Sequence, residues 1–174
     1  MASHAGGCLC GNVRFAVAGD PIGVTTCHCL FCQRATGSAY MVEPYFSRAV
    51  FSITSGSPAT YDHRSEGSGK IVHIHFCAIC GTKTHLTFER YPDDLSIYAG
   101  TFDDPHWFEI RPDNSKHVFL NTARYETIIP PHIEVYEQHR TLNDGTLLEP
   151  TVFEIPHVIG RRPSANSTDS SAAP

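Results

Sequence analysis

The sequence predicts a mainly β fold, and three observations lead to that prediction. The chain of 174 residues contains 12 prolines and 13 glycines, which divide it into short segments. These segments are rich in Val, Ile, Thr, Phe and Tyr, which favour strands and turns rather than helices. A helical pattern is convincing only over residues 30–35, where Gly37 is suited to end the helix. We therefore expect one domain of short strands with one short helix.

The expected elements follow one another closely along the chain. Residues 1–6 are small and are expected to be flexible, and the main domain is expected to span 7–138. Pro44 lies inside the expected strand 40–46, which predicts a sheet edge or a bulge there. Residues 139–160 are expected to form an extension packed on the domain, and the Ser/Ala/Pro-rich segment 161–174 is expected to be disordered. The expected strands cover 8–17, 22–29, 40–46, 50–55, 59–63, 70–76, 83–88, 95–99, 118–121 and 147–155.

Composition and charge exclude several classes of partner. The formal net charge is −5, and no Lys/Arg cluster appears apart from Arg161 and Arg162. A nucleic acid or a membrane surface is therefore not the expected partner, and nothing in the sequence indicates an oligomeric state. No apolar run approaches the roughly 20 residues that a membrane-spanning helix needs. Because the N-terminus has no signal-peptide pattern, we expect a cytoplasmic protein with reduced thiols.

Three cysteines, Cys27, Cys29 and Cys32, fall within six residues. In an extended chain the side chains of Cys27 and Cys29 point to the same face, and a turn brings Cys32 toward them. Three protein ligands is the number that zinc uses when it keeps a fourth position open for chemistry. This spacing predicts an open, catalytic zinc site.

The other four of the seven cysteines form two short pairs, Cys8 with Cys10 and Cys77 with Cys80. Four thiolates suit the closed tetrahedral site of a structural zinc ion. We therefore expect two Zn²⁺ ions per chain. Disulfides are the alternative, but the odd thiol count and the tight spacing disfavour them.

Five segments of the chain form a recognisable pattern. They are Gly7-Cys8-Leu9-Cys10-Gly11, Cys27-His28-Cys29-Leu30-Phe31-Cys32, Thr36-Gly37-Ser38, His75-Phe76-Cys77-Ala78-Ile79-Cys80-Gly81 and Ala99-Gly100-Thr101-Phe102-Asp103-Asp104-Pro105. This pattern resembles the glutathione-dependent formaldehyde-activating enzyme (GFA) family, which includes centromere protein V. The resemblance covers about residues 6–138, and 116–119 adds a weaker match.

The resemblance implies a β-tent of antiparallel sheets, like that of Mss4, and the same division of the cysteines into a structural and a catalytic zinc site. It also implies a zinc-dependent carbon–sulfur lyase that joins glutathione and formaldehyde as S-hydroxymethylglutathione. Three thiolates donate strongly to zinc, so capture of a substrate thiol is favoured over activation of water.

Other residues have both a functional and a structural interpretation. His28 is a candidate acid/base, although a strand would point it away from the metal. Arg34 is a candidate ligand for a substrate carboxylate, or a solvated surface residue. Ser38 lines a pocket or merely follows the end of the helix. His73 and His75 share one strand face, where histidines are more often structural than metal-binding.

Three functions remain open from the sequence. The first is the GFA-type lyase, whose partner is a small-molecule thiol or carbonyl with glutathione as a candidate. The second is an enzyme of the same fold that acts on a larger carbonyl or thiol adduct in specialised metabolism, which the segment beyond Gln138 keeps open. The third is a non-catalytic, zinc-stabilised interaction domain, which the acidic balance disfavours.

Overall fold

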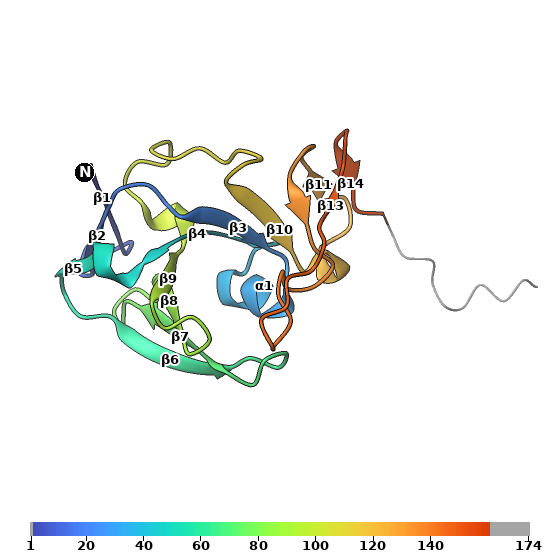
Figure 1. Ribbon diagram of the computed structural model, residues 1–174. Coiled ribbons are helices and arrows are strands. Elements are labelled where there is room, and N and C mark those ends of the chain that lie inside the picture. Colours follow the sequence, from blue (N-terminus) through green and yellow to red (C-terminus); the bar gives the residue numbers. More distant parts are fainter. Residues whose placement is uncertain (1, 161–174) are drawn as a thin grey trace, which may run out of the picture.

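The computed structural model describes residues 2–160 and shows a mainly β protein with three sheets and one α-helix (Figure 1). A three-stranded sheet lies at the N-terminal end, a nine-stranded sheet forms the body, and a two-stranded sheet lies in the C-terminal part. No helix among the described residues is long and apolar enough to cross a membrane. The predicted fold class, mainly β with one short helix, is confirmed.

The spatial order of the strands differs from their order in the chain. The small sheet is β1 (Ser3–Gly7), β2 (Arg14–Ala18) and β5 (Phe51–Ser55). The large sheet is, from one edge to the other, β13 (Thr151–Val152), β12 (Glu134–Val135), β10 (Ser115–Val118), β3 (Gly23–Cys27), β4 (Met41–Ser47), β9 (Asp94–Ile97), β8 (Lys83–Phe88), β7 (Ile71–Phe76) and β6 (Ala59–Arg64). The last sheet is β11 (Ile128–Ile129) with β14 (His157–Val158).

The large sheet is not wholly antiparallel. Strand β10 runs parallel to β3 on one side and to β12 on the other, whereas every other pair of neighbouring strands in this sheet is antiparallel. Parallel neighbours need long connections, and the chain between β3 and β10 forms most of the rest of the sheet. The parallel pairing of β10 with β3 and β12 could not be predicted from the local sequence pattern.

The N-terminal segment differs from the prediction in two ways. Residues 3–6, expected to be flexible, lie in β1, which pairs with β2 from Ser3↔Ala18 onward. Of the expected strand 8–17, residues 8–13 form a tight turn instead, and residues 14–17 lie in β2 as expected. The turn closes because the Cys8 N–H donates to the Val13 carbonyl at 2.9 Å, and Gly11 adopts a φ of 76°. Both cysteines of the first pair therefore lie on a turn and not on a strand.

Strand β4 is central, although Pro44 predicted an edge or a bulge. Antiparallel β3 pairs with it on one side, with Val24 opposite Pro44. On the other side the ladder to β9 covers only Tyr45–Ser47, so it begins just after the proline. The missing N–H of Pro44 therefore interrupts no ladder bond, which is why a central strand tolerates it.

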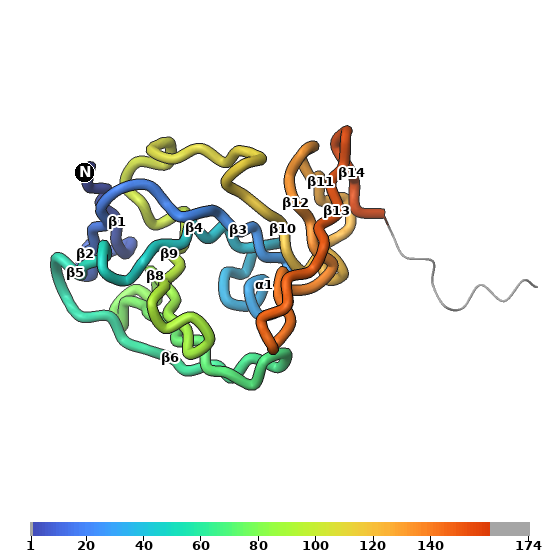
Figure 2. Tube along the Cα trace, in the orientation of Figure 1, coloured from blue at the N-terminus to red at the C-terminus, as the bar shows by residue number. Residues whose placement is uncertain are grey.

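The large sheet curves until its two halves face each other across α1 (Leu30–Thr36) (Figure 2). The helix follows β3, yet the ring of Phe31 stacks on that of His63 in β6, with 4.6 Å between ring centroids. A buried cluster of side chains lies on the side of the sheet that faces α1, and we call this side the inner face. The cluster consists of Cys27, Cys32, Met41, Ile74, Leu86, Tyr98, Val118 and Tyr136.

The C-terminal part also differs from the expected strands. The strand expected over 118–121 is β10 followed by the 3-10 turn η3 (Leu120–Thr122), because Phe119 takes a left-handed φ of 62° and ends the strand. The edge strand expected over 147–155 is reduced to β13. Two further 3-10 turns, η1 (Arg48–Val50) and η2 (Ala99–Thr101), connect strands. The expected disordered tail, 161–174, lies outside the described residues.

Candidate metal centres

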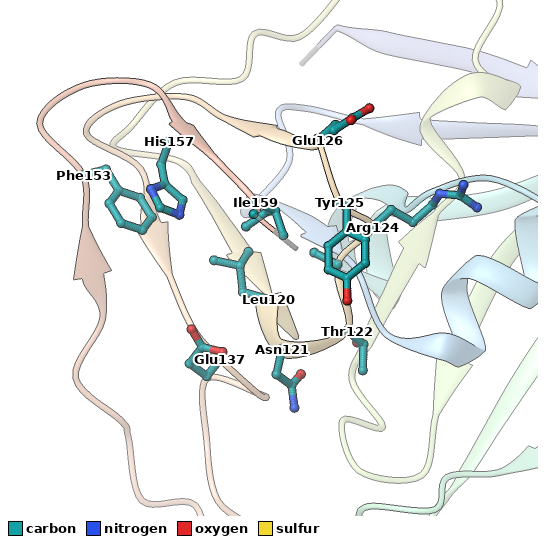
Figure 3. Close-up of a pocket in the computed structure, with 12 residues that line it drawn as sticks. Leu120, Asn121, Thr122, Arg124, Tyr125, Glu126, Glu137, Phe153, His157 and Ile159 are labelled. Carbon is teal, nitrogen blue, oxygen red and sulfur yellow. The ribbon is translucent and has the colours of Figure 1, made fainter. Parts of the chain in front are cut away.

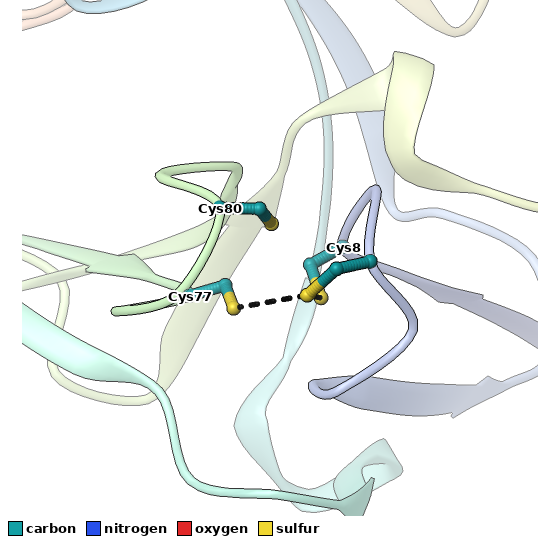
Figure 4. A group of neighbouring side chains, drawn as sticks. Cys8, Cys77 and Cys80 are labelled. Carbon is teal, nitrogen blue, oxygen red and sulfur yellow. Dashed lines mark hydrogen bonds between the residues drawn. The ribbon is translucent and has the colours of Figure 1, made fainter.

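The first cysteine pair and the third meet at one point. Cys8 and Cys10 lie on the turn between β1 and β2, and Cys77 and Cys80 lie on the turn between β7 and β8. Figure 4 shows the side chains of Cys8, Cys77 and Cys80 converging from these two turns. The four sulfur atoms lie within 4.8 Å of one another.

The spacing of these sulfurs fits a tetrahedral zinc ion. The Sγ atoms of Cys8 and Cys10 are 3.6 Å apart, and those of Cys10 and Cys77 are 3.7 Å apart. Zn–S bonds of about 2.3 Å at tetrahedral angles place sulfurs about 3.8 Å apart. All seven cysteines lie among the described residues and are free thiols, so no disulfide competes with this arrangement.

Backbone and hydroxyl groups support the four-cysteine group. The Val13 N–H donates to Cys8 Sγ at 3.2 Å, and the Thr82 hydroxyl lies 3.3 Å from Cys80 Sγ. Hydrogen bonds from the Thr82 side chain and backbone lower the pKa of Cys80 to about 5. In the turn that carries Cys77 and Cys80, Gly81 takes a φ of 75°, and its N–H donates to the Cys77 carbonyl at 2.8 Å.

The remaining three cysteines form a second group at the start of α1. Cys27 ends β3, Cys29 is the N-cap of the helix, and Cys32 lies in the first turn. The Cys32 N–H donates to Cys29 Sγ at 3.3 Å, and Gly37 ends the helix with a φ of 69°, as predicted. The three sulfurs lie within 4.8 Å of one another. We call this group the cysteine trio.

The trio differs from the four-cysteine group in its number of ligands, and it contains no exposed cysteine, whereas Cys10 is exposed. Cys27 and Cys32 are 4% and 3% exposed, whereas Cys29 is half-buried. Hydrogen bonds from Cys27 and Cys32 lower the pKa of Cys29 to about 3. Because Cys27 and Cys32 are the donors in these bonds, the pKa of each of them is raised. The donor set suits a soft cation with one position left for another ligand.

His28 contacts a second histidine, His117. Its ring is fully buried, and its Nε2 lies 3.0 Å from Nδ1 of His117. Burial lowers the pKa of both rings to about 4, so both are neutral near pH 7. This contact supports the structural interpretation, and an acid/base role for His28 stays a prediction.

The two residues proposed for substrate binding lie on the outside of the helix end. Arg34 is exposed in the last turn of α1, and Ser38 is exposed just after Gly37. The Ser38 N–H donates to the Thr36 hydroxyl at 3.1 Å, which fits a helix-stop role. Binding of substrate by Arg34 or Ser38 stays a prediction.

His73 and His75 have ordinary partners within the sheet. His73 Nδ1 lies 2.7 Å from the Asp62 carboxylate, and His75 contacts Thr60 and Thr87. Among residues 2–160, the groups of three or more ligand side chains close enough to share an ion are the two cysteine groups.

Sequence reasoning missed the polar residues that lie on the inner face beside the trio. Thr25 is flanked in register by Glu43 on β4 and Lys116 on β10, so the three side chains share one face. The Lys116 ammonium lies 4.7 Å from the ring centroid of Tyr45. Burial raises the pKa of Glu43 to about 8, and the nearby Cys29 adds to the rise. No local motif could have identified these residues, because strand order alone brings them together.

A hollow of about 700 Å³ lies elsewhere, between η3 and the C-terminal extension (Figure 3). Its lining includes Leu120, Tyr125, Phe153 and His157, and it contains none of the trio. Thr122 connects the hollow with the segment that carries the trio, because it lines the hollow and its hydroxyl donates to the His28 carbonyl at 3.0 Å.

Comparison with known proteins places the chain in a family. The sequence profile of the family described as "Glutathione-dependent formaldehyde-activating enzyme" (GFA) matches residues 3–122. The chain belongs to the GFA family. A solved structure, described as the crystal structure of a Rhodobacter sphaeroides protein, is similar at 19% identity with a TM-score of 0.47, over 61% of this chain and 96% of the other. Both cysteine groups of this GFA protein lie within the matched range.

Proposed function

We propose that this GFA-family protein is a zinc-dependent carbon–sulfur lyase that makes and breaks adducts between a thiol and a carbonyl compound. The observation that carries the proposal is the trio: three sulfurs lie within 4.8 Å of one another, and Cys29 is half-buried. The four-cysteine group would hold the structural ion, and the trio would hold the catalytic one.

Cys27, Cys29 and Cys32 would hold the zinc ion, which would lower the pKa of a substrate thiol. The chain supplies the geometry around it. The Cys32 N–H keeps Cys29 Sγ in place, and the carbonyl of His28 is held by Thr122 and by Gln33 Nε2 at 2.7 Å. The segment that carries the trio is therefore rigid before any substrate arrives.

The reaction joins the substrate sulfur to the carbonyl carbon. As the C–S bond forms, the π electrons of the carbonyl move to its oxygen, which takes up a proton in place of the one that the thiol released. The reverse reaction breaks the same bond. With glutathione and formaldehyde the product is S-hydroxymethylglutathione, and the family name makes these two compounds the first substrates to test.

Titration calorimetry of the zinc-loaded protein with glutathione tests the binding step, and exchange spectroscopy of glutathione with its hydroxymethyl adduct tests turnover. Cys29→Ser should abolish both while one zinc ion stays bound. Cys10→Ser is the matched control, because it should release the other ion and lower the melting temperature. Turnover retained in Cys29→Ser would refute the proposal. Binding and turnover that are both absent in the wild type would favour a different substrate or the interaction-domain alternative.

A further inference from the structure

Tyr98 has a buried hydroxyl whose place in the fold is unusual. The residue follows β9, and its side chain belongs to the buried cluster that also contains Cys27 and Cys32. It is 8% exposed, and its Oη has no hydrogen-bond partner among the described residues. Buried hydroxyls nearly always have a partner, so this one calls for an explanation.

The backbone holds the Tyr98 ring in this position. Its N–H donates to the Thr84 carbonyl at 3.1 Å, and its carbonyl accepts from the Thr101 hydroxyl at 2.7 Å and from the Thr101 N–H at 2.9 Å. The ring packs in the cluster with Met41 and Leu86. The backbone is therefore fixed and the ring is packed among apolar side chains, while the hydroxyl is left for a ligand to accept from.

The Tyr98 hydroxyl is itself buried, whereas the inner face beside the trio is partly exposed. A tyrosine hydroxyl is protonated at neutral pH and can donate a hydrogen bond. Thr25, Glu43 and Lys116 are only half-buried, although β3, β4 and β10 all have neighbours on both sides. The inner face beside the trio is therefore not fully covered.

We propose that the Tyr98 hydroxyl donates a hydrogen bond to the carbonyl oxygen of the substrate that reacts at the trio. This inference rests on the proposed function and makes Tyr98 a catalytic residue for it. The carbonyl oxygen gains negative charge as the C–S bond forms, so a fixed donor stabilises the transition state more than the ground state. A substrate sulfur would be a poor acceptor for the same hydroxyl, because thiol and thioether sulfurs accept only weakly.

Tyr98→Phe removes this one oxygen atom and leaves the ring in place. We expect a rate of exchange between glutathione and its hydroxymethyl adduct about 100-fold lower than in the wild type, the low end of the effect of losing one oxyanion donor. Binding of glutathione alone should not change. The melting temperature should stay the same or rise, because the folded chain loses no hydrogen bond between described residues.

Tyr136→Phe is the matched control from the same cluster. Its hydroxyl donates to the Glu134 carboxylate at 2.9 Å, and the residue is 4% exposed. This variant should lower the melting temperature and leave the exchange rate close to that of the wild type. If Tyr98 has no role in the reaction, the exchange rate of Tyr98→Phe should instead stay as close to that of the wild type as the rate of Tyr136→Phe.

A second measurement uses the wild-type protein and does not depend on activity. In protein labelled at the tyrosine ζ carbon, the hydroxymethyl adduct of glutathione should shift the Tyr98 resonance and not that of Tyr136. An unshifted Tyr98 resonance in protein that binds the adduct, or unchanged exchange in Tyr98→Phe, would overturn the inference and leave the proposed function standing. A wild type that neither binds nor converts these compounds would overturn both.

Discussion

The sulfur of Cys10 lies 3.7 Å from that of Cys77, although 67 residues separate them in the chain. The two residues lie on turns that join strands of different sheets, since one turn follows β1 and the other follows β7. The Leu9 N–H also joins the two turns, because it donates to the Thr82 hydroxyl at 3.2 Å. An ion bound by all four sulfurs would therefore link the three-stranded sheet to the nine-stranded sheet.

Removal of metal should destabilise the protein strongly. Zinc binding contributes on the order of 10 kcal/mol or more to folding in small zinc domains, and here it would hold two sheets together. We expect chelation to lower the melting temperature by tens of degrees or to unfold the chain, as followed by circular dichroism. Re-addition of Zn²⁺ should reverse the effect. A melting curve that is the same before and after chelation would show that the sulfurs do not need an ion.

Gly81→Ala should destabilise the turn that carries Cys77 and Cys80, and it should do so only through the backbone conformation of residue 81. The residue has a φ of 75°, and an added Cβ would meet nothing within 4 Å. A left-handed conformation costs a non-glycine residue about 1–2 kcal/mol, so the free energy of unfolding should fall by about that amount. Gly67→Ala is the matched control, because its added Cβ also has open space and its φ is not in the left-handed region.

Denaturant unfolding of the two glycine variants, measured with zinc present, checks this prediction. The control should stay within about 0.5 kcal/mol of the wild type, as most surface substitutions do. Equal losses in the two variants would contradict the backbone argument.

His117→Leu should reveal what His28 does. The substitution leaves His28 Nε2 without its partner at 3.0 Å in a fully buried position. A buried polar group without a partner costs about 1–3 kcal/mol, so the melting temperature should fall. If His28 is structural, the pH dependence of turnover should keep its shape while stability falls. A changed pH profile with unaltered stability would instead support the acid/base interpretation.

Buried His85 should make the protein less stable in acid. Burial, with the nearby His75, lowers its pKa from 6.5 to about 3 in the folded state. Above pH 6.5 the ring is neutral in both states and folding is not opposed. As the pH falls from 6.5 toward 3, His85 binds a proton in the unfolded chain but not in the folded chain. The free energy of unfolding should then fall by at most about 1.4 kcal/mol per pH unit from this group.

Comparison of the wild type with His85→Gln isolates that contribution, because both proteins keep the same cysteines. Urea unfolding at pH 7.5, 6.0 and 5.0 should show a shallower loss of stability in the variant. Parallel pH curves for the two proteins would mean that His85 titrates alike in the folded and unfolded states.

Several features could be predicted from the sequence because they depend on neighbouring residues. Cys27, Cys29 and Cys32 are so close in the chain that one turn brings them together, and the left-handed Gly37 and Gly81 follow from the ends of short elements. The family resemblance depended on the same local segments. Pro44 was a misleading sign of a sheet edge, because the range of the β9 ladder, and not the proline, decides which N–H groups are needed.

The amino-acid order by itself determined the division of the cysteines into four and three, since ligand spacing is a property of a few consecutive residues. Only the tertiary structure decided what surrounds the three. Tyr98, Glu43 and Lys116 come from three separate parts of the large sheet, whose strand order and register arise from long-range pairing, including the parallel placement of β10 beside β3. That pairing depends on how the whole inner face is buried, which no local segment specifies.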